Sequence, residues 1–376
     1  MIAAFDEVLG RQVSMRAMAL LRVLAGPIVL LHLRPFLLDA LNGKTYRDTF
    51  YEPYASWYPE LPTPLYIAVL CVGALAAVAM TVGWHTRAAT TTVFAVVTYN
   101  LFLSTTHVHN NRVYLIVVLA ALAVAPSGRE LSLDAWRRAR AGLPPLPTTA
   151  PAWPLWLLRF EASVVYGASG LSKLLDSDWF GGTVTWHRVV RTREQLEGSV
   201  LPDWVITVLA DRSFHTLAAK VIIATELFIA FGLWWRRSRY AAVWIAVCFH
   251  VAIEVSARVE VFSYLAIAAL VIWAVPSTRD RVLIVDFSVG RHRTLVTATR
   301  WLDWLARFRI VAGPPGCPIS VVHRDGSVRD GPAAVRFVLS RLPLTAWFAL
   351  PTLLLRAPKQ AAVDPPGAPS QVTRVG

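Results

Sequence analysis

The sequence predicts an all-α integral membrane protein with about eight membrane-crossing helices and a small cytoplasmic C-terminal extension. Hydrophobic residues make up 55% of the 376 residues, whereas only 16% are charged. The mean hydropathy is +0.49. Because the charged residues cluster between long apolar runs, the pattern is typical of a polytopic helical membrane protein and not of a soluble enzyme.

Eight apolar stretches are long enough to cross, or nearly cross, a hydrocarbon core, which takes about 20 helical residues. In chain order they are Ala17 to Leu38, Leu65 to Trp84, Ala88 to Leu103, Val113 to Pro126, Leu155 to Leu175, Leu217 to Trp235, Tyr240 to Val255 and Val261 to Val275. The fourth, seventh and eighth are short, so we expect them to extend into polar flanks, to tilt or to be partly re-entrant. Pro27 interrupts the first stretch and predicts a kink there.

Three connections between these stretches are long. Arg34 to Pro64 is rich in tyrosine and is expected to lie at headgroup depth, where aromatic residues concentrate. Ser127 to Pro154 is basic and rich in proline, which predicts a polar linker with a short amphipathic helix from about Leu131 to Arg140. Asp176 to Phe214 is the longest internal loop and holds three tryptophans.

The pattern changes after Pro276, and we expect a small separate domain from 277 to 360 followed by a disordered tail from 361 to 376. Loose alternation and turn residues predict strands, and helical spacing predicts helices. The expected elements are a strand at Val282 to Phe287, a basic amphipathic helix at Trp301 to Arg309, a strand at Ile319 to His323 and a helix at Ala333 to Leu342.

The net charge of +13 comes mostly from arginines in short loops. Such residues favour the cytoplasmic side and meet anionic lipid. An inside N-terminus places Arg87 and the Arg236 to Arg239 link inside, while the links before Arg112 and around Arg258 are poor in basic residues. We therefore predict a multi-pass protein of the cytoplasmic (inner) membrane with both termini cytoplasmic. Nucleic acid is not an expected partner, because no basic domain with its own fold is visible.

Lys173 is the most informative residue, because it lies at the end of an apolar run with helical spacing. An ammonium group rarely lies beside hydrocarbon unless it reaches water, pairs with an acid or loses its proton. Lys173 is therefore either an interfacial anchor or a base. Tyr166 and either Ser169 or Gly170 share its helix face, since residues three or four apart lie together.

The predicted topology brings three polar groups to the same side of the membrane: the link before the fourth span, the end of the fifth span and the outer half of the seventh. Ionisable residues within spans are candidates for function. The residues concerned are Asn110, Asn111, Arg112, Lys173, His250, Glu254 and Arg258.

These groups also have structural interpretations that need no function. His250 can be a hydrogen-bonded contact between helices. Glu254 and Arg258 are four residues apart and can form an ion pair within one helix. Asn110 and Asn111 can cap a helix or form a turn. Sequence alone leaves both interpretations open.

Four short motifs occur in an order and spacing that resemble a known family. They are Asn110-Asn111-x-x-Tyr114-Leu115, then Ser169-Gly170-Leu171-Ser172-Lys173-Leu174-Leu175-Asp176-Ser177-Asp178-Trp179, then Phe249-His250, then Phe262-Ser263-Tyr264. The region from Arg16 to Pro276 resembles the vitamin K-dependent gamma-carboxylase family. More narrowly, it resembles the bacterial members built around the horizontally transferred transmembrane (HTTM) domain, to which we assign residues 1–276.

The resemblance implies a membrane enzyme in which an intramembrane lysine deprotonates a reduced naphthoquinone such as menaquinol. In that family the quinone is epoxidised with O2, and the strong base so formed removes a proton from a peptide or protein glutamate, which captures CO2. By position, Lys173 matches the base and His250 matches an active-site histidine. The expected quinone-binding residues are Asn110, Asn111, Arg112, Tyr166, Glu254 and Arg258.

Two features depart from the families concerned. Arg112 stands where the animal carboxylases have histidine, and an arginine can bind an anion but cannot act as an acid–base at neutral pH. From Ile310 onward the tail resembles the end of the thiol-disulfide oxidoreductase-like DCC domain, but the two-cysteine motif is missing and Cys317 stands alone. We therefore assign no redox activity to this degenerate DCC-like region.

Two further classes of function compete with the enzyme. A non-enzymatic quinone- or lipid-binding protein, or a small transporter, would use the same cavity without turnover. A bis-histidine haem protein would need His32 and His250 on facing spans. No metal site is expected, because His107 and His109 lack a third ligand.

Overall fold

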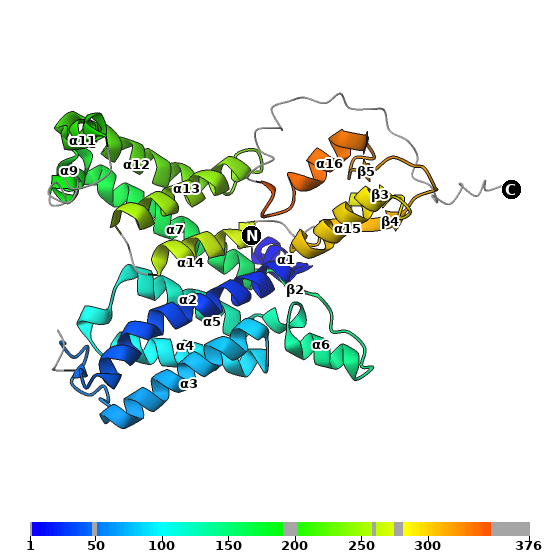
Figure 1. Ribbon diagram of the computed structural model, residues 1–376. Helices are drawn as coiled ribbons and strands as arrows, with labels where there is room; N and C mark the ends of the chain where they lie inside the picture. Colours follow the sequence, from blue (N-terminus) through cyan, green and yellow to red (C-terminus); the bar gives the residue numbers. More distant parts are fainter. Residues whose placement is uncertain (1, 47–50, 191–201, 258–260, 274–280, 347–376) are drawn as a thin grey trace. The chain divides into compact units, whose positions relative to one another are not determined.

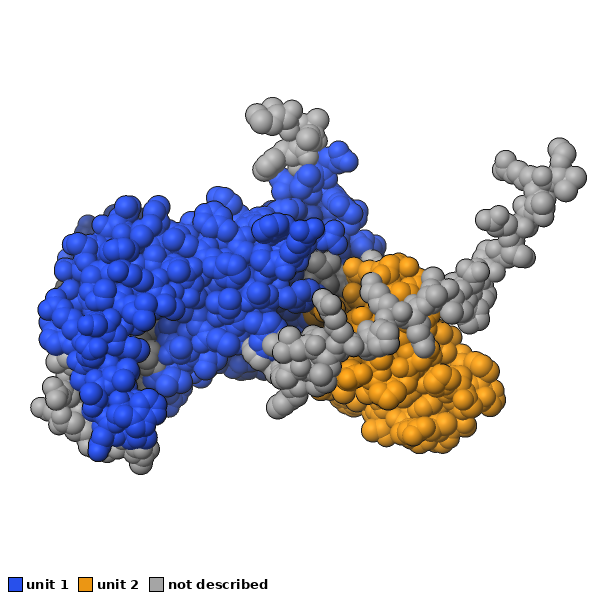
Figure 2. All heavy atoms as spheres, turned by 90° about the horizontal axis from the view of Figure 1, so that it is seen from above, with its two compact units in different colours: residues 1–273 blue, residues 274–376 orange. Residues whose placement is uncertain are grey.

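The computed structural model describes residues 2–46, 51–190, 202–257, 261–273 and 281–346. The chain divides into two compact units, Met1–Trp273 and Ala274–Gly376, coloured separately in Figure 2. The described part of the first unit is helical apart from one pair of three-residue strands, whereas the second unit contains a four-stranded sheet, so the all-α prediction holds only for the helices of the first unit.

The first unit is built from helices of very different length (Figure 1). The long ones are α2 (Arg16–Leu41), α3 (Thr63–Val82), α4 (Thr86–Phe102), α5 (Asn110–Val124), α7 (Trp153–Leu175), α12 (Arg212–Gly232) and α13 (Arg239–Ala257). The shorter helical elements are α1 (Ile2–Gly10), η2 (Thr105–His107), η3 (Ser127–Arg129), α6 (Leu133–Arg140), α8 (Ser177–Phe180), α9 (Thr183–Val190), α11 (Asp203–Ala210), α14 (Phe262–Ala269) and η4 (Leu270–Trp273). Two short strands, β1 (Gln12–Ser14) and β2 (Thr149–Pro151), pair antiparallel.

Helical structure lies at each of the eight places that the apolar stretches predict. Within the described part of the chain, α2, α3 and α12 are long and apolar enough to cross a membrane by length and composition. Eight crossings therefore stay a prediction. The predicted amphipathic helix near Leu131 is confirmed as α6, and α2 continues through Pro27 to Leu41 as one helix.

Packing in the first unit leaves apolar side chains on the outside of the long helices. Helices α2, α3, α4 and α5 pack in sequence order, and α7 packs along α12. Leu75 of α3 and Phe231 of α12 are 71% and 73% exposed. Large exposed side chains of this kind on long, mainly apolar helices indicate contact with lipid.

Arg22 is fully buried within α2 and is held by backbone carbonyls. Its Nη1 donates to Met80 O at 2.6 Å, and its Nη2 donates to Leu131 O at 2.6 Å. The first of these acceptors belongs to the last turn of α3, whose carbonyls carry partial negative charge. The sequence shows no partner for this arginine, because neither acceptor is a side chain.

The second unit contains a four-stranded sheet in the order β4-β3-β5-β6. Strands β3 (Arg281–Val285) and β4 (Phe308–Ala312) run parallel, joined through α15 (Gly290–Leu302). Strands β5 (Ser320–Val322) and β6 (Val328–Asp330) are antiparallel to their neighbours, and α16 (Gly331–Leu339) follows. Both predicted strands and the last predicted helix are confirmed; the predicted disordered tail lies outside the described residues.

The predicted basic helix from Trp301 to Arg309 is wrong. Helix α15 ends at Leu302, and a turn leads into β4. The Asp303 carboxylate accepts hydrogen bonds from the backbone N–H groups of Arg307 and Phe308, which fixes the turn. Phe308 then enters the core of the unit. The spacing of charged and aromatic residues that suggests one helix therefore covers the end of α15, a turn and the start of β4.

Candidate functional site

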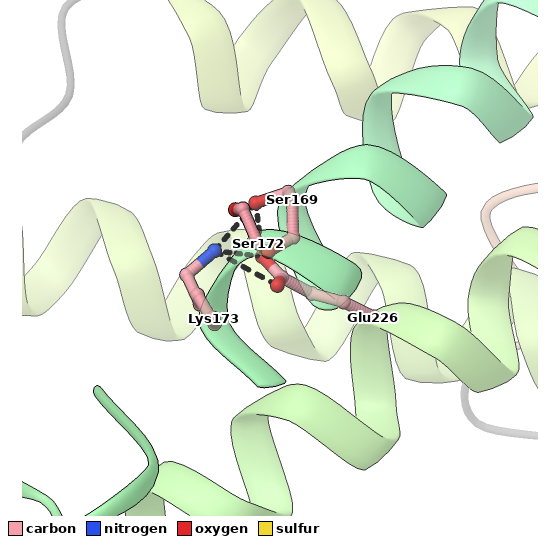
Figure 3. Close-up of polar contacts among 4 residues, drawn as sticks. All are labelled: Ser169, Ser172, Lys173 and Glu226. Atoms are coloured by element: carbon pink, nitrogen blue, oxygen red, sulfur yellow. Dashed lines mark hydrogen bonds and ion pairs between the residues drawn. The ribbon is translucent and has the colours of Figure 1, made fainter. Parts of the chain in front are cut away.

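Lys173 lies in the last turn of α7 and is held by a carboxylate from α12 (Figure 3). Its Nζ donates to both Glu226 oxygens, at 2.9 and 2.8 Å, and to Ser169 Oγ at 2.5 Å. Ser169 Oγ in turn donates to Glu226 Oε1 at 3.0 Å. The side chains of Lys173 and Glu226 are only 15% and 7% exposed. The result is a largely buried ion pair with a bridging hydroxyl.

Local sequence explains how the pair forms. Ser169 and Lys173 are four residues apart, so they share one face of α7, as the spacing predicts. Gly170 lies between them and lets α12 approach, because a Cβ at that position would lie 3.0 Å from Leu227 and 3.3 Å from Glu226 Cβ. The small residue therefore sets the helix separation at which the lysine reaches its carboxylate.

Glu226 is not among the site residues that the sequence predicts. A signal was present, because Glu226 is the one acidic residue in the apolar stretch from Leu217 to Trp235. A carboxylate in such a stretch needs a cation or hydrogen-bond donors. The ion pair also bears on the choice between anchor and base, because the ammonium of Lys173 is paired with an acid and its side chain is only 15% exposed. Its Nζ lies 5.1 Å from the centre of the Trp179 ring.

A second pair joins two more of the predicted residues. The hydroxyl of Tyr166 and Nε2 of His250 lie 2.5 Å apart in a hydrogen bond between α7 and α13. His250 is fully buried, its Nδ1 has no hydrogen-bond partner among the described residues, and its ring packs against Phe262. One imidazole nitrogen is thus occupied and the other lies in apolar surroundings.

Helix α7 carries both pairs. Tyr166 and Ser169 are three residues apart, and Lys173 follows four residues later, so all three lie along one face. Two neighbouring helices supply the partners, Glu226 from α12 and His250 from α13. A row of proton donors and acceptors therefore runs along about two turns of α7.

The Asn110 to Arg112 segment begins α5. His109 caps the helix by accepting a hydrogen bond from the Asn111 N–H at 3.3 Å, and Asn110 is exposed. Arg112 donates to His107 O at 3.1 Å and lies over the Phe36 ring of α2. These partners come from α2 and η2, whereas Lys173 and His250 take theirs from α7, α12 and α13.

Arg112 also lines a cavity of about 170 Å³ at the ends of α2 and α4. Lys44, Tyr46 and Tyr66 are among its other walls. The carboxylate of Asp39 also lines the cavity, beside the guanidinium and ammonium groups. The lining therefore carries both signs of charge, and the anion-binding role expected of Arg112 stays a prediction.

Glu254 accepts a hydrogen bond from the hydroxyl of Tyr264 at 3.1 Å, while its other carboxylate oxygen is buried with no hydrogen-bond partner among the described residues. Its predicted partner Arg258 lies outside the described residues. The ion pair expected within α13 therefore stays a prediction.

The cavity beside Tyr166 is small. It has a volume of about 10 Å³ and is lined by aromatic and aliphatic side chains that include Tyr114, Phe262 and Trp273. That space holds about one water molecule. The hydroxyl, imidazole and ammonium groups suit a quinol oxygen, but a naphthoquinone ring fits only if the surrounding helices separate.

These features define the class: a helical membrane protein with a buried polar site between its helices. A family model of the HTTM domain matches residues 11–277, which is well over half of the chain. The chain therefore belongs to the HTTM domain family. No curated protein and no solved structure matches it.

Proposed function

We propose that this protein is a vitamin K-dependent carboxylase-like membrane enzyme that acts on a reduced naphthoquinone with O2. The observation that carries the proposal is the buried Lys173–Glu226 pair, which lies within the region matched to the HTTM domain. The sequence resemblance places the base of the vitamin K-dependent carboxylases at Lys173. A buried base is what proton abstraction in a membrane site requires.

The pair provides a base without changing the net charge of the site. Transfer of one proton from Lys173 Nζ to a Glu226 oxygen leaves a neutral amine beside a neutral acid. Ser169 Oγ holds both groups during this transfer through its two hydrogen bonds. The amine then accepts a proton from the substrate hydroxyl.

Tyr166 and His250 form the second part of the proposed site. Their hydrogen bond orients the imidazole, and the apolar packing of Phe262 against it keeps water away. Exclusion of water protects reactive species from hydrolysis and strengthens hydrogen bonds. A bound reduced naphthoquinone supplies the reaction with oxygen that yields the quinone epoxide, and CO2 is the further co-substrate where an acceptor is carboxylated.

The test is conversion of reduced menaquinone to its epoxide by purified protein under oxygen. Wild-type protein is expected to form epoxide, and Lys173→Ala to lose this activity by a hundredfold or more, in the range for removal of a general base. Lys220→Ala is the matched control, since Lys220 is an exposed lysine on α12 whose ammonium lies over Phe180. Full activity in Lys173→Ala would show that the base is assigned wrongly.

The alternative is a quinone- or lipid-binding protein, or a small transporter, without turnover. It also requires the helices around the small cavity beside Tyr166 to separate, but it needs space for one ligand and not for a second substrate as well. Quinone that stays bound without forming epoxide, in wild type and Lys173→Ala alike, would support this alternative. Transport would show as substrate movement that depends on a gradient.

A further inference from the structure

A cavity of about 460 Å³ lies beside α6, away from Lys173. One wall is α6 itself and the other is the segment that returns from it toward β2. The lining is mostly apolar, and two arginines are part of it. The lining residues include Ala135, Ala139, Leu143, Leu146, Arg129 and Arg138.

Both arginines hold the cavity in shape. Arg138 Nε donates to Pro144 O at 2.6 Å, and Arg129 Nη1 donates to the carbonyls of Pro147 and Thr149 at 3.1 and 2.7 Å. These bonds fix the returning segment against α6 and η3. A guanidinium has five N–H donors, so each arginine keeps donors for an anion.

The carboxylates nearby bind groups other than the arginines of η3 and α6, and Glu130 keeps one buried oxygen, Oε2, without a hydrogen-bond partner among the described residues. Asp134 accepts hydrogen bonds from the backbone of His85 and Thr86, where it fixes the start of α4. Glu130 forms an ion pair with Arg16 at 3.0 Å. The positive charge around the cavity is therefore not neutralised: within the described ranges, no ion pair includes Arg129, Arg137, Arg138 or Arg140.

The cavity lies where several helix ends meet. The N–H of Asp134 donates to Gly83 O in the turn between α3 and α4, so α6 is tied to that turn. Trp84, Trp136 and Trp153 are all exposed, and the Arg140 guanidinium lies 5.2 Å from the Trp136 ring centre. Exposed tryptophans beside arginines at helix ends mark headgroup depth in a membrane.

We propose that this cavity is a binding site for an anionic phospholipid. The phosphate binds Arg129 and Arg138, whose guanidinium groups match phosphate geometry. An acyl chain lies against the apolar wall that Leu143 and Leu146 provide. The proposal combines an uncompensated pair of arginines with an apolar slot at headgroup depth, and it does not depend on the proposed quinone chemistry.

The experiment mixes delipidated full-length protein with equal amounts of phosphatidylglycerol and phosphatidylcholine in detergent and counts bound lipid by native mass spectrometry. Wild type is expected to retain phosphatidylglycerol preferentially. Arg129→Gln/Arg138→Gln should weaken that binding tenfold or more, in line with the contribution of two basic residues near a lipid headgroup. Arg137→Gln/Arg140→Gln removes the same charge from α6 outside the cavity and should change binding less than threefold.

A second variant tests the space inside the cavity independently of the arginine charges. Ala139→Trp fills the space without altering any arginine, and it should also release phosphatidylglycerol while the thermal unfolding midpoint is kept. Equal losses from both arginine pairs would mean diffuse attraction and would overturn the site. Equal retention of the two lipids, or unchanged binding in Ala139→Trp, would overturn it as well.

Discussion

The Lys173–Glu226 pair shows how a single residue depends on its partner inside a membrane protein. Each charge alone would be desolvated by the surrounding helices, and together they neutralise one another through two short contacts. A buried pair of this kind adds little net stability compared with apolar residues of similar size, but breaking it leaves an uncompensated charge. Net stability alone therefore does not account for the pair.

Single and double substitutions are expected to separate these two effects. Lys173→Met or Glu226→Leu alone should destabilise the protein by about 3–5 kcal/mol, because one buried charge loses its partner. The double variant should lie within about 1–2 kcal/mol of wild type. Thermal unfolding midpoints in detergent give the comparison. If the double variant is as unstable as the worse single one, the pair has a structural role beyond neutralisation.

In the second unit, the carboxylate of Asp286 is held by hydrogen bonds from two loops. Its Oδ1 accepts from the Ser288 hydroxyl and its Oδ2 accepts from the Gly316 N–H, which ties the loop after β3 to the loop before β5. The Ser288 hydroxyl foremost, and then the backbone N–H of Gly316, lower the pKa of the Asp286 carboxyl. Since these bonds favour the ionised form, their contribution to stability is present above the ordinary carboxyl pKa of 3.8.

Acid should weaken the second unit through this residue. The folded pKa is lowered, so the unfolded chain binds the proton first and the contribution disappears as the pH falls through the folded pKa. Amide exchange of β3 in the full chain, followed by mass spectrometry between pH 7 and 3, measures this loss. Asp286→Asn should flatten the acid dependence. The same steep loss in Asp286→Asn would exclude the carboxyl as its source.

Partners were harder to predict than the residues themselves. The helical spacing of Tyr166, Ser169 and Lys173 follows from sequence alone, because it needs only one helix. The contact of Tyr166 with His250 crosses 84 positions of the chain and depends on the packing of two helices. The pairing of Glu226 with Lys173 likewise depends on the packing of two helices, although the sequence does show a single acidic residue in an apolar stretch.

Helix ends in the first unit are fixed by small residues and backbone acceptors. Gly83 ends α3 with φ +74°, in the left-handed region that favours glycine. A Cβ there would lie 2.5 Å from Arg22 Nη1 and 2.4 Å from Ser132 Cβ. The same residue therefore satisfies the backbone of α3 and leaves space for the buried arginine.

Gly83→Ala is expected to destabilise the protein by more than about 2 kcal/mol, since left-handed strain adds to a clash with two side chains. Gly142→Ala is the matched control: Gly142 has φ +69° but nothing within 4 Å of a Cβ. It should show only the strain, about 1 kcal/mol. Unfolding midpoints of the two variants test this, and equal losses would mean that the space around Arg22 is not limiting.

Elements were predictable where the apolar pattern was long and unbroken. Helices α2, α3 and α12 follow directly from such stretches. The region from Trp301 to Arg309 failed because a run of charged and aromatic residues has helical spacing by chance, while the Asp303 carboxylate selects a turn. Side-chain to backbone hydrogen bonds of this kind compete with helix formation. The spacing of apolar and charged residues along the sequence does not reveal them.

At the scale of the whole molecule, membership of the HTTM domain family and the exposed apolar helices indicate a membrane protein. Its orientation in the membrane is predicted from the distribution of basic residues among the links between helices. The arginines of η3 and α6 lie in one polar segment, whereas the link around Val108 holds no lysine and one arginine, at its end. Basic residues in such segments stay on the cytoplasmic side. The charge distribution therefore predicts that Gly142 faces the cytoplasm and Val108 the outside.

Cysteine labelling tests that orientation directly. In a variant with Cys71, Cys248 and Cys317 replaced by serine, single substitutions Val108→Cys, Gly142→Cys and Arg291→Cys place a thiol at three exposed positions. A membrane-impermeant maleimide should label the first in intact cells and the other two only after lysis, because both termini are expected inside. Labelling of Gly142→Cys in intact cells would reverse the orientation and move the α6 cavity to the outer leaflet. Labelling of Arg291→Cys together with Val108→Cys, but not of Gly142→Cys, in intact cells would instead require an odd number of crossings between Gly142 and Arg291, and the predicted count of eight would then be wrong.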